Sequence, residues 1–136
     1  GVGADNEVSL PPTRCVIANN IVVGKNAPLV KEISKPENFK WEGNIFYGAD
    51  PGIKLEEGIT QVDPKLKLGL DSLYRPQKDS PVIGAAKGSY DFVKYDIDGQ
   101  TRLGKKDIGC DQFSDTPIKR RYILPDDTGY IWKFFK

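Results

Sequence analysis

The side chains that could carry out chemistry are limited first by the absence of histidine, since none of the 136 residues is His. Ser-His-Asp triads, Cys-His pairs, HExxH zinc sites and His-based general acid–base catalysis are therefore excluded within this sequence. Lysine, arginine and the carboxylates remain as possible acids, bases or ligands. A lysine can act as a general base where burial or a neighbouring positive charge lowers its pKa.

Two aspartates with a following glycine, Asp96, Asp98 and Gly99, have the spacing of the first ligands of a calcium loop. An EF-hand loop needs a further oxygen ligand at its fifth position, a glycine at its sixth and a Glu at its twelfth. Here the glycine comes at the fourth position and the twelfth is Asp107. We therefore expect a turn, in which Arg102 pairs with Asp107 or Asp111, and no metal bound by this segment.

A second carboxylate motif consists of the adjacent Glu56 and Glu57, followed by Gly58. Two carboxylates could serve as the acid and base of a glycosidase. Adjacent residues in a loop rarely point in the same direction, so the sequence favours a solvated turn at this place.

The two cysteines, Cys15 and Cys110, fit no CxxC or zinc-ligand spacing. A disulfide between them would close a loop of about 95 residues and could stabilise the fold by about 4–5 kcal/mol. Alternatively, both are buried thiols that pack as small apolar side chains. Each cysteine lies in an apolar run, which favours the second interpretation.

Arg75 and a basic tail could bind an anionic ligand; in the tail, residues 119–121 (Lys-Arg-Arg) precede Tyr122, Tyr130 and Trp132. Arginine binds carboxylates through its planar fork, and aromatic rings can stack on sugar faces. The alternatives are structural. Arg75 would then form an internal ion pair, and the tail would cover one end of the domain.

The composition narrows the class of protein. The 20 Lys and Arg against 19 Asp and Glu leave a net charge of +1, which argues against a nucleic-acid or anionic-membrane binder that works by bulk charge. No apolar run approaches the ~18–20 residues of a membrane span. The absence of Met indicates a segment of a longer chain.

The elements that must position these side chains are short β-branched runs bounded by Asn, Gly and Pro, which predict strands. Residues 20–24 (Asn-Ile-Val-Val-Gly) recur as residues 44–48 (Asn-Ile-Phe-Tyr-Gly), an offset of 24. This period predicts an all-β fold of the right-handed parallel β-helix type, with Asn20 stacked on Asn44 and Ile21 on Ile45 inside it. A β-sandwich would instead show turns every 8–12 residues.

The pattern becomes irregular after about residue 50. We therefore expect residues 1–60 to form the last coils of the β-helix and residues 61–136 to form an irregular C-terminal capping segment of the same domain. Solenoids need such atypical ends, because each repeat contacts only its neighbours.

Several segments in succession resemble a known family. Residues 36–48, 62–66, 73–76, 80–86, 96–102 and 106–111 are similar, in this order, to the C-terminal end of the polysaccharide lyases that include chondroitinase B and the poly(β-D-mannuronate) (alginate) lyases. The similarity covers about residues 8–132. The resemblance to this family depends on the combination of the repeat at residues 20–24 and 44–48 with the later segments.

The resemblance implies β-elimination on a uronate-containing polymer, such as alginate or a dermatan or chondroitin polymer. Members use a Lys base, an Arg acid and a Ca²⁺ that neutralises the uronate carboxylate, since a hard cation with oxygen ligands offsets that charge. It also implies a secreted or periplasmic enzyme. The partners would be an acidic polysaccharide and the remainder of the same lyase, with no nucleic acid and no membrane.

The sequence departs from the family at the catalytic positions. Lys35, after Glu32, Ile33 and Ser34, has a context similar to that of the family's Lys base, but no Arg lies between Arg14 and Arg75. The catalytic coils are therefore expected upstream, with this segment structural and Lys35 a solvated side chain before a proline turn. The alternative function is a non-catalytic β-helical module that binds carbohydrate or forms a surface.

Overall fold

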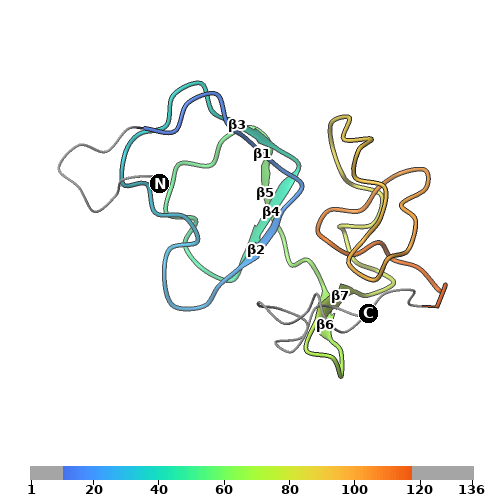
Figure 1. The fold of residues 1–136 in the computed structure, drawn as a ribbon. Coiled ribbons are helices and arrows are strands. Elements are labelled where there is room, and N and C mark those ends of the chain that lie inside the picture. The colour runs from blue at the N-terminus through green and yellow to red at the C-terminus, as the bar shows by residue number, and fades with distance from the viewer. Residues whose placement is uncertain (1–10, 118–136) are drawn as a thin grey trace, which may run out of the picture.

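The computed structural model describes residues 11–117. Within them there are seven short strands and no helix, and nothing that could cross a membrane as an apolar helix (Figure 1). The strands are β1 (Val16–Ala18), β2 (Ile21–Val23), β3 (Lys40–Glu42), β4 (Asn44–Tyr47), β5 (Ile59–Gln61), β6 (Leu66–Leu68) and β7 (Tyr74–Pro76).

The strands belong to three small sheets. β1 pairs with β3, and β2, β4 and β5 pair in that order; all of these pairs are parallel. β6 and β7 form an antiparallel hairpin. Ile21 lies opposite Ile45, so the 24-residue offset in the sequence is the register that joins β2 to β4.

The predicted parallel β-helix is wrong as a description of these residues, because the strands form separate small sheets and residues 11–117 contain no closed sheet or solenoid. Parallel pairing stops after β5. There the Asp63 carboxylate accepts the backbone N–H of Lys65 (2.8 Å), which makes a turn, and Pro64 has no N–H to offer a ladder. Two copies of a strand pattern fix one register, but they do not determine how the chain continues.

Side chains on both faces of the β2–β4–β5 sheet make packing contacts, since successive side chains of a strand point to opposite sides. Ile21 and Ile45 pack against Val82 and Ile108 of the C-terminal segment. Phe46 points the other way and meets Trp41 of β3 edge-on, with 5.9 Å between the ring centroids. The predicted stacking of Ile21 on Ile45 is therefore confirmed, but the pair faces the C-terminal segment instead of β3.

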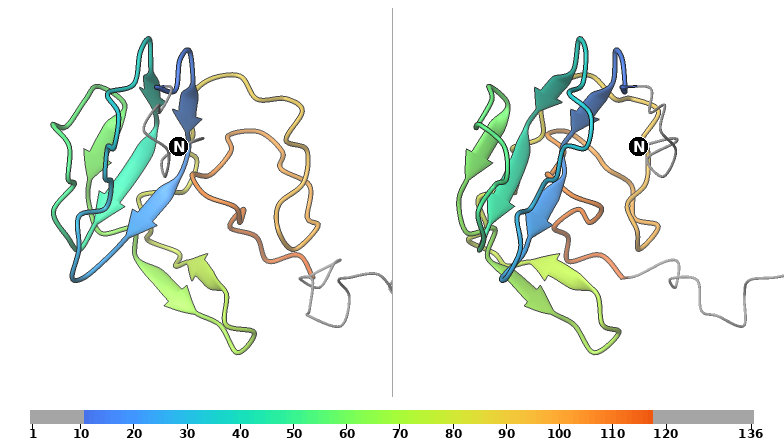
Figure 2. Two further views of the ribbon diagram at one scale, coloured as in Figure 1. Left: turned by 60° about the vertical axis from the view of Figure 1, so that its left-hand side comes forward. Right: turned by 90° about the vertical axis from the view of Figure 1, so that its left-hand side faces the viewer.

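The described residues after β7 contain no strand and lie beside the sheet as a series of turns, coloured yellow to orange in Figure 2. Asn19, between β1 and β2, ties this segment to the sheet. Its side chain exchanges two hydrogen bonds of 2.8 Å with the backbone of Lys87, and its C=O accepts the N–H of Gly109 (2.9 Å). Asn19 has a φ of +56°, a left-handed conformation that asparagine tolerates. The expected division at residues 60 and 61 stays a prediction.

Candidate functional site

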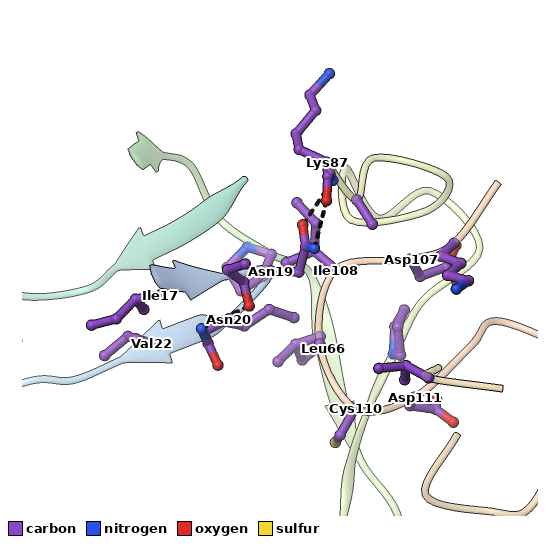
Figure 3. Close-up of a pocket in the computed structure, with 18 of the residues that line it drawn as sticks. Ile17, Asn19, Asn20, Val22, Leu66, Lys87, Asp107, Ile108, Cys110 and Asp111 are labelled. Atoms are coloured by element: carbon purple, nitrogen blue, oxygen red, sulfur yellow. Dashed lines mark hydrogen bonds between the residues drawn. The ribbon is translucent and has the colours of Figure 1, made fainter. Parts of the chain in front are cut away.

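An open groove of about 2070 Å³ runs along β1 and β2 and continues against the C-terminal segment. Figure 3 shows Ile17 and Val22 side by side on the strands, with Leu66, Ile108 and Cys110 farther along the groove. The strand side of the groove, at Ile17 and Val22, is apolar and suits an apolar surface, whereas charged side chains such as Arg102 and Asp111 line the part formed by the C-terminal segment.

Two stacked asparagines stand beside this groove, as the repeat predicted. The Asn20 backbone N–H and side-chain Nδ2 both donate to Oδ1 of Asn44, each at 3.0 Å. Asn20 Nδ2 also donates to the C=O of Ala18 (2.9 Å), and Asn44 Nδ2 donates to the C=O of Ile17 (2.7 Å). Asn44 is 1% exposed, so these bonds satisfy an amide that would otherwise be costly to bury.

The polar part of the groove contains a carboxyl group in an unfavourable environment. Asp111 is 6% exposed, and burial raises its pKa to about 6, with the nearby Asp98 and Asp96 carboxylates adding to the shift. Cys110 is an exposed residue, but partial desolvation of its thiol, followed by the Asp111 charge, raises the pKa of that thiol. This part of the groove can hold a proton near neutral pH, and it disfavours a reactive thiolate.

Arg102 does not form the predicted ion pair with Asp107 or Asp111, and that prediction is wrong. Its Nη2 donates to backbone C=O groups instead, most closely to that of Gly109 (2.6 Å). The Asp107 carboxylate is already occupied by the backbone N–H groups of Gly84 and Phe113, each at 2.6 Å. Backbone donors have therefore taken the place that the arginine was expected to fill.

Arg75, the candidate substrate contact, lies between two carboxylates. Its Nε and Nη2 donate to Asp98 (2.9 and 2.8 Å), and its Nη1 and Nη2 donate to Asp71 (2.8 and 2.7 Å). These bonds, first Asp71 and then Asp98, raise the pKa of the guanidinium, and Arg75 lowers the pKa of Asp71. The geometry is that of the structural ion pair, and a role for Arg75 in substrate binding stays a prediction.

Lys35, the candidate base, is exposed and lies just before Pro36. It lines a second groove, of about 1060 Å³, together with Trp41, Glu56 and Glu57. Arg75 does not line that groove, so the structure does not bring the candidate base and the candidate arginine together there. Glu56 and Glu57 are both exposed residues of the turn before β5.

The aspartates with calcium-loop spacing use their oxygens within the protein. Asp96 accepts the backbone N–H groups of Gln100 (2.7 Å) and Gln112 (3.3 Å), while Asp98 binds Arg75. The predicted turn is present, and Gly99 has the positive φ of +74° that it requires. In the part of the chain that the structure describes, no three His, Cys, Asp or Glu side chains are grouped as a metal site.

Both cysteines are free and exposed, so Cys15 and Cys110 are joined by no disulfide, and the expectation of buried thiols is wrong. An apolar neighbour did not predict burial of the cysteine itself, since Val16 beside Cys15 is 53% exposed and Cys110 is exposed although Ile108 is buried. The basic tail, residues 119–121 with its aromatic partners, lies outside the described residues.

Asn19 is a site-forming residue that the sequence did not single out, and Asp107 was considered only as a calcium-loop position or a partner of Arg102, not as an acceptor for backbone N–H groups. The Asn19-Asn20 pair at the end of a strand is the local signal of a left-handed corner, and it could have indicated Asn19. Asp107 has no such signal, since its donors lie 23 residues before it and 6 after it. No protein-family model matches this chain, and neither a curated protein nor a solved structure is significantly similar to it.

Proposed function

We propose that this chain is the C-terminal, structural part of a polysaccharide lyase that cleaves a uronate-containing polymer, of the alginate or dermatan and chondroitin type, by β-elimination. The residues that abstract and return protons belong to the rest of that enzyme. The resemblance of the segments between residues 36 and 111 supports the family. The observation that supports a structural role is the pair of strand edges, β1 and β2, beside an apolar groove.

The charged side chains of the described residues also favour a supporting role. Arg75 directs its donors to Asp71 and Asp98, which joins the β6–β7 hairpin to the segment that follows it. Lys35 is an exposed side chain, whereas a lysine that acts as a general base is commonly buried. Arg75 would have to break its hydrogen bonds with Asp71 and Asp98 before it could bind the carboxylate of a substrate.

In this proposal, calcium would be bound by residues in the rest of the enzyme and not by the residues described here. A calcium site needs six to eight oxygen ligands. The described carboxylates best placed by sequence, Asp96 and Asp98, already accept backbone N–H groups and the Arg75 guanidinium. These residues do not fit a calcium site, so no step of the reaction is assigned to a metal in this chain.

The test is to express the full protein that contains this chain and to supply alginate, dermatan sulfate, chondroitin sulfate and neutral dextran. We expect the absorbance of an unsaturated uronate to rise with one of the acidic polymers and not with dextran. Binding of an acidic polymer without any unsaturated product would overturn the lyase proposal and favour the non-catalytic carbohydrate-binding module.

A further inference from the structure

The polar end of the groove contains a carboxylate that no neighbour uses. Asp111 is 6% exposed, and its carboxylate accepts no hydrogen bond from any residue between 11 and 117. In the same part of the chain, the one fully buried side-chain N or O atom without a partner is Nε of Arg102. The oxygens of Asp111 are therefore not sealed inside the protein, and they open on the groove that Asp111 lines. Such an acid is costly to leave without a partner.

The two neighbouring carboxylates are already used within the protein. Asp96 accepts a backbone N–H group through each of its oxygens, and Asp98 accepts the Arg75 guanidinium through both of its own. Of these three aspartates, Asp111 alone has both oxygens available for a ligand. One carboxylate supplies at most two of the six to eight oxygens that a calcium ion takes. A ligand that can be bound by a single carboxylate is therefore the better match.

The two arginines nearest to Asp111 do not fill this place. Arg75 directs its donors to Asp71 and Asp98. Nη2 of Arg102 donates to the backbone C=O of Asp111 (3.3 Å) and not to its carboxylate. Both positive charges lower the pKa of Asp111, but burial and the neighbouring carboxylates outweigh them. The environment of Asp111 therefore favours the addition of a cation.

The groove beside Asp111 has apolar walls. Leu66 and Ile108 line it between Asp111 and the strands β1 and β2 (Figure 3). An arginine side chain matches this combination, because its planar fork can bind both oxygens of one carboxylate while its alkyl stem lies on apolar surface. The protein already contains such a pair, in which Nη1 and Nη2 of Arg75 donate to the two oxygens of Asp71 (2.8 and 2.7 Å).

We propose that Asp111 binds the guanidinium of an arginine carried by a segment of another protein, with apolar neighbours of that arginine along Leu66, Ile17 and Val22. The groove, at about 2070 Å³, exceeds the ~300–1,000 Å³ of pockets that hold small ligands, so a peptide segment fits it better than a free amine. The inference goes beyond the proposed function, because it assigns a protein ligand to a carboxylate that takes no part in β-elimination.

The test is the binding of short blocked peptides to the full protein at about pH 7.5, where Asp111 is ionised, followed by the NMR signals of the Leu66 and Ile108 backbone N–H groups. An arginine between two leucines should bind at least about tenfold more tightly than citrulline, its neutral isostere, in the same peptide. Asp111→Asn should abolish this preference, and the exposed control Asp115→Asn should keep it. Serines in place of the leucines should weaken binding about threefold or more.

Equal binding of the arginine and citrulline peptides, or an arginine preference that survives in Asp111→Asn, would overturn the proposal. So would equal binding with serine and leucine, because the apolar walls would then contribute nothing. Binding that appears only in the double variant Arg120→Gln/Arg121→Gln would show that the chain's own arginine takes the site, and would also overturn it. Catalysis does not enter this result. A full protein that binds the arginine peptide but cleaves no uronate polymer would refute the proposed function alone.

Discussion

Residues 11–62 and residues 63–117 are held together by different kinds of interaction. Five of the seven strands lie in the first region, where parallel ladders repeat the same pairing. The second region has one hairpin, β6–β7, and otherwise consists of turns. The first is held by parallel ladders between its strands, whereas the second combines backbone hydrogen bonds of turns and loops with side chains that bind the backbone.

Asp107 and Ser80 illustrate how side chains form hydrogen bonds with backbone groups in the second region, which has few strands. Asp107 is 1% exposed and accepts bonds from two backbone N–H groups and from Gln112 Nε2 (3.1 Å). The Ser80 hydroxyl donates to the C=O of Pro64 (2.6 Å). Buried polar groups need partners. A chain without ladders can therefore satisfy its backbone through a few well-placed side chains, but each of these becomes difficult to replace.

The largest expected effect is in the first region. Phe46 is 1% exposed, so Phe46→Ala should lower the free energy of unfolding of the full protein by about 3–5 kcal/mol, through lost apolar burial and the cavity left behind. The matched control is Phe92→Ala, because Phe92 is 79% exposed and should change stability by less than about 0.5 kcal/mol. Equal effects of the two substitutions in denaturant titrations would contradict the assignment of the core.

The second-largest expected effect is the loss of stability when the Asp107 carboxylate is removed from the second region. Asp107→Ala leaves the backbone N–H groups of Gly84 and Phe113 without their acceptor, and should cost about 2–4 kcal/mol in the free energy of unfolding. Asp115→Ala, at an exposed position of the same segment, should cost less than about 0.5 kcal/mol. If Asp107→Ala unfolds at the wild-type denaturant concentration, side-chain bonds do not hold this region.

The smallest effect is a gain in stability that depends on pH. The folded-state pKa of Asp111 is about 6, above its ordinary value of 3.8, so the folded protein holds this proton more tightly than the unfolded chain. The free energy of unfolding should therefore fall as pH rises from about 4 to about 6. Asp111→Asn cannot ionise, and should be more stable than wild type by about 1–2 kcal/mol above pH 6, and unchanged in stability below pH 4.

Denaturant titrations of wild type and Asp111→Asn at about pH 4 and about pH 7.5 measure this difference. Asp115→Asn, at an exposed position of the same segment, serves as the control for replacing a carboxylate by an amide. A loss of stability for Asp111→Asn at the higher pH would mean that the Asp111 carboxylate is stabilised by a partner in the folded protein.

The sequence was most informative where the structure repeats. The Asn and Ile of residues 20–24 and 44–48 predicted the parallel register of β2 with β4 and the bond between Asn20 and Asn44, because one spacing sets every pair in a ladder. The same pattern predicted a parallel β-helix, which the structure contradicts. Pairing between two neighbouring strands does not decide how a chain of separate sheets is assembled.

The second region was harder to predict because its contacts are specific and non-repeating. Arg75 could be expected to pair with a carboxylate, but its two partners, Asp71 and Asp98, lie 4 and 23 residues away. Arg102 was predicted to bind the carboxylate of Asp107 or Asp111, but it donates to the backbone C=O groups of both residues and of Gly109. Hydrogen-bond geometry in a turn depends on backbone direction, which residue types alone do not specify.

The central claim is that this chain supports a lyase without supplying its catalytic groups, and the most direct test is the turnover number of Lys35→Gln in the full protein. The account predicts a kcat on the acidic polymer within about twofold of wild type, because it assigns no step of the reaction to the exposed Lys35. A fall in kcat of about a hundredfold or more, with the free energy of unfolding unchanged, would contradict it, since general-base catalysis typically contributes that much.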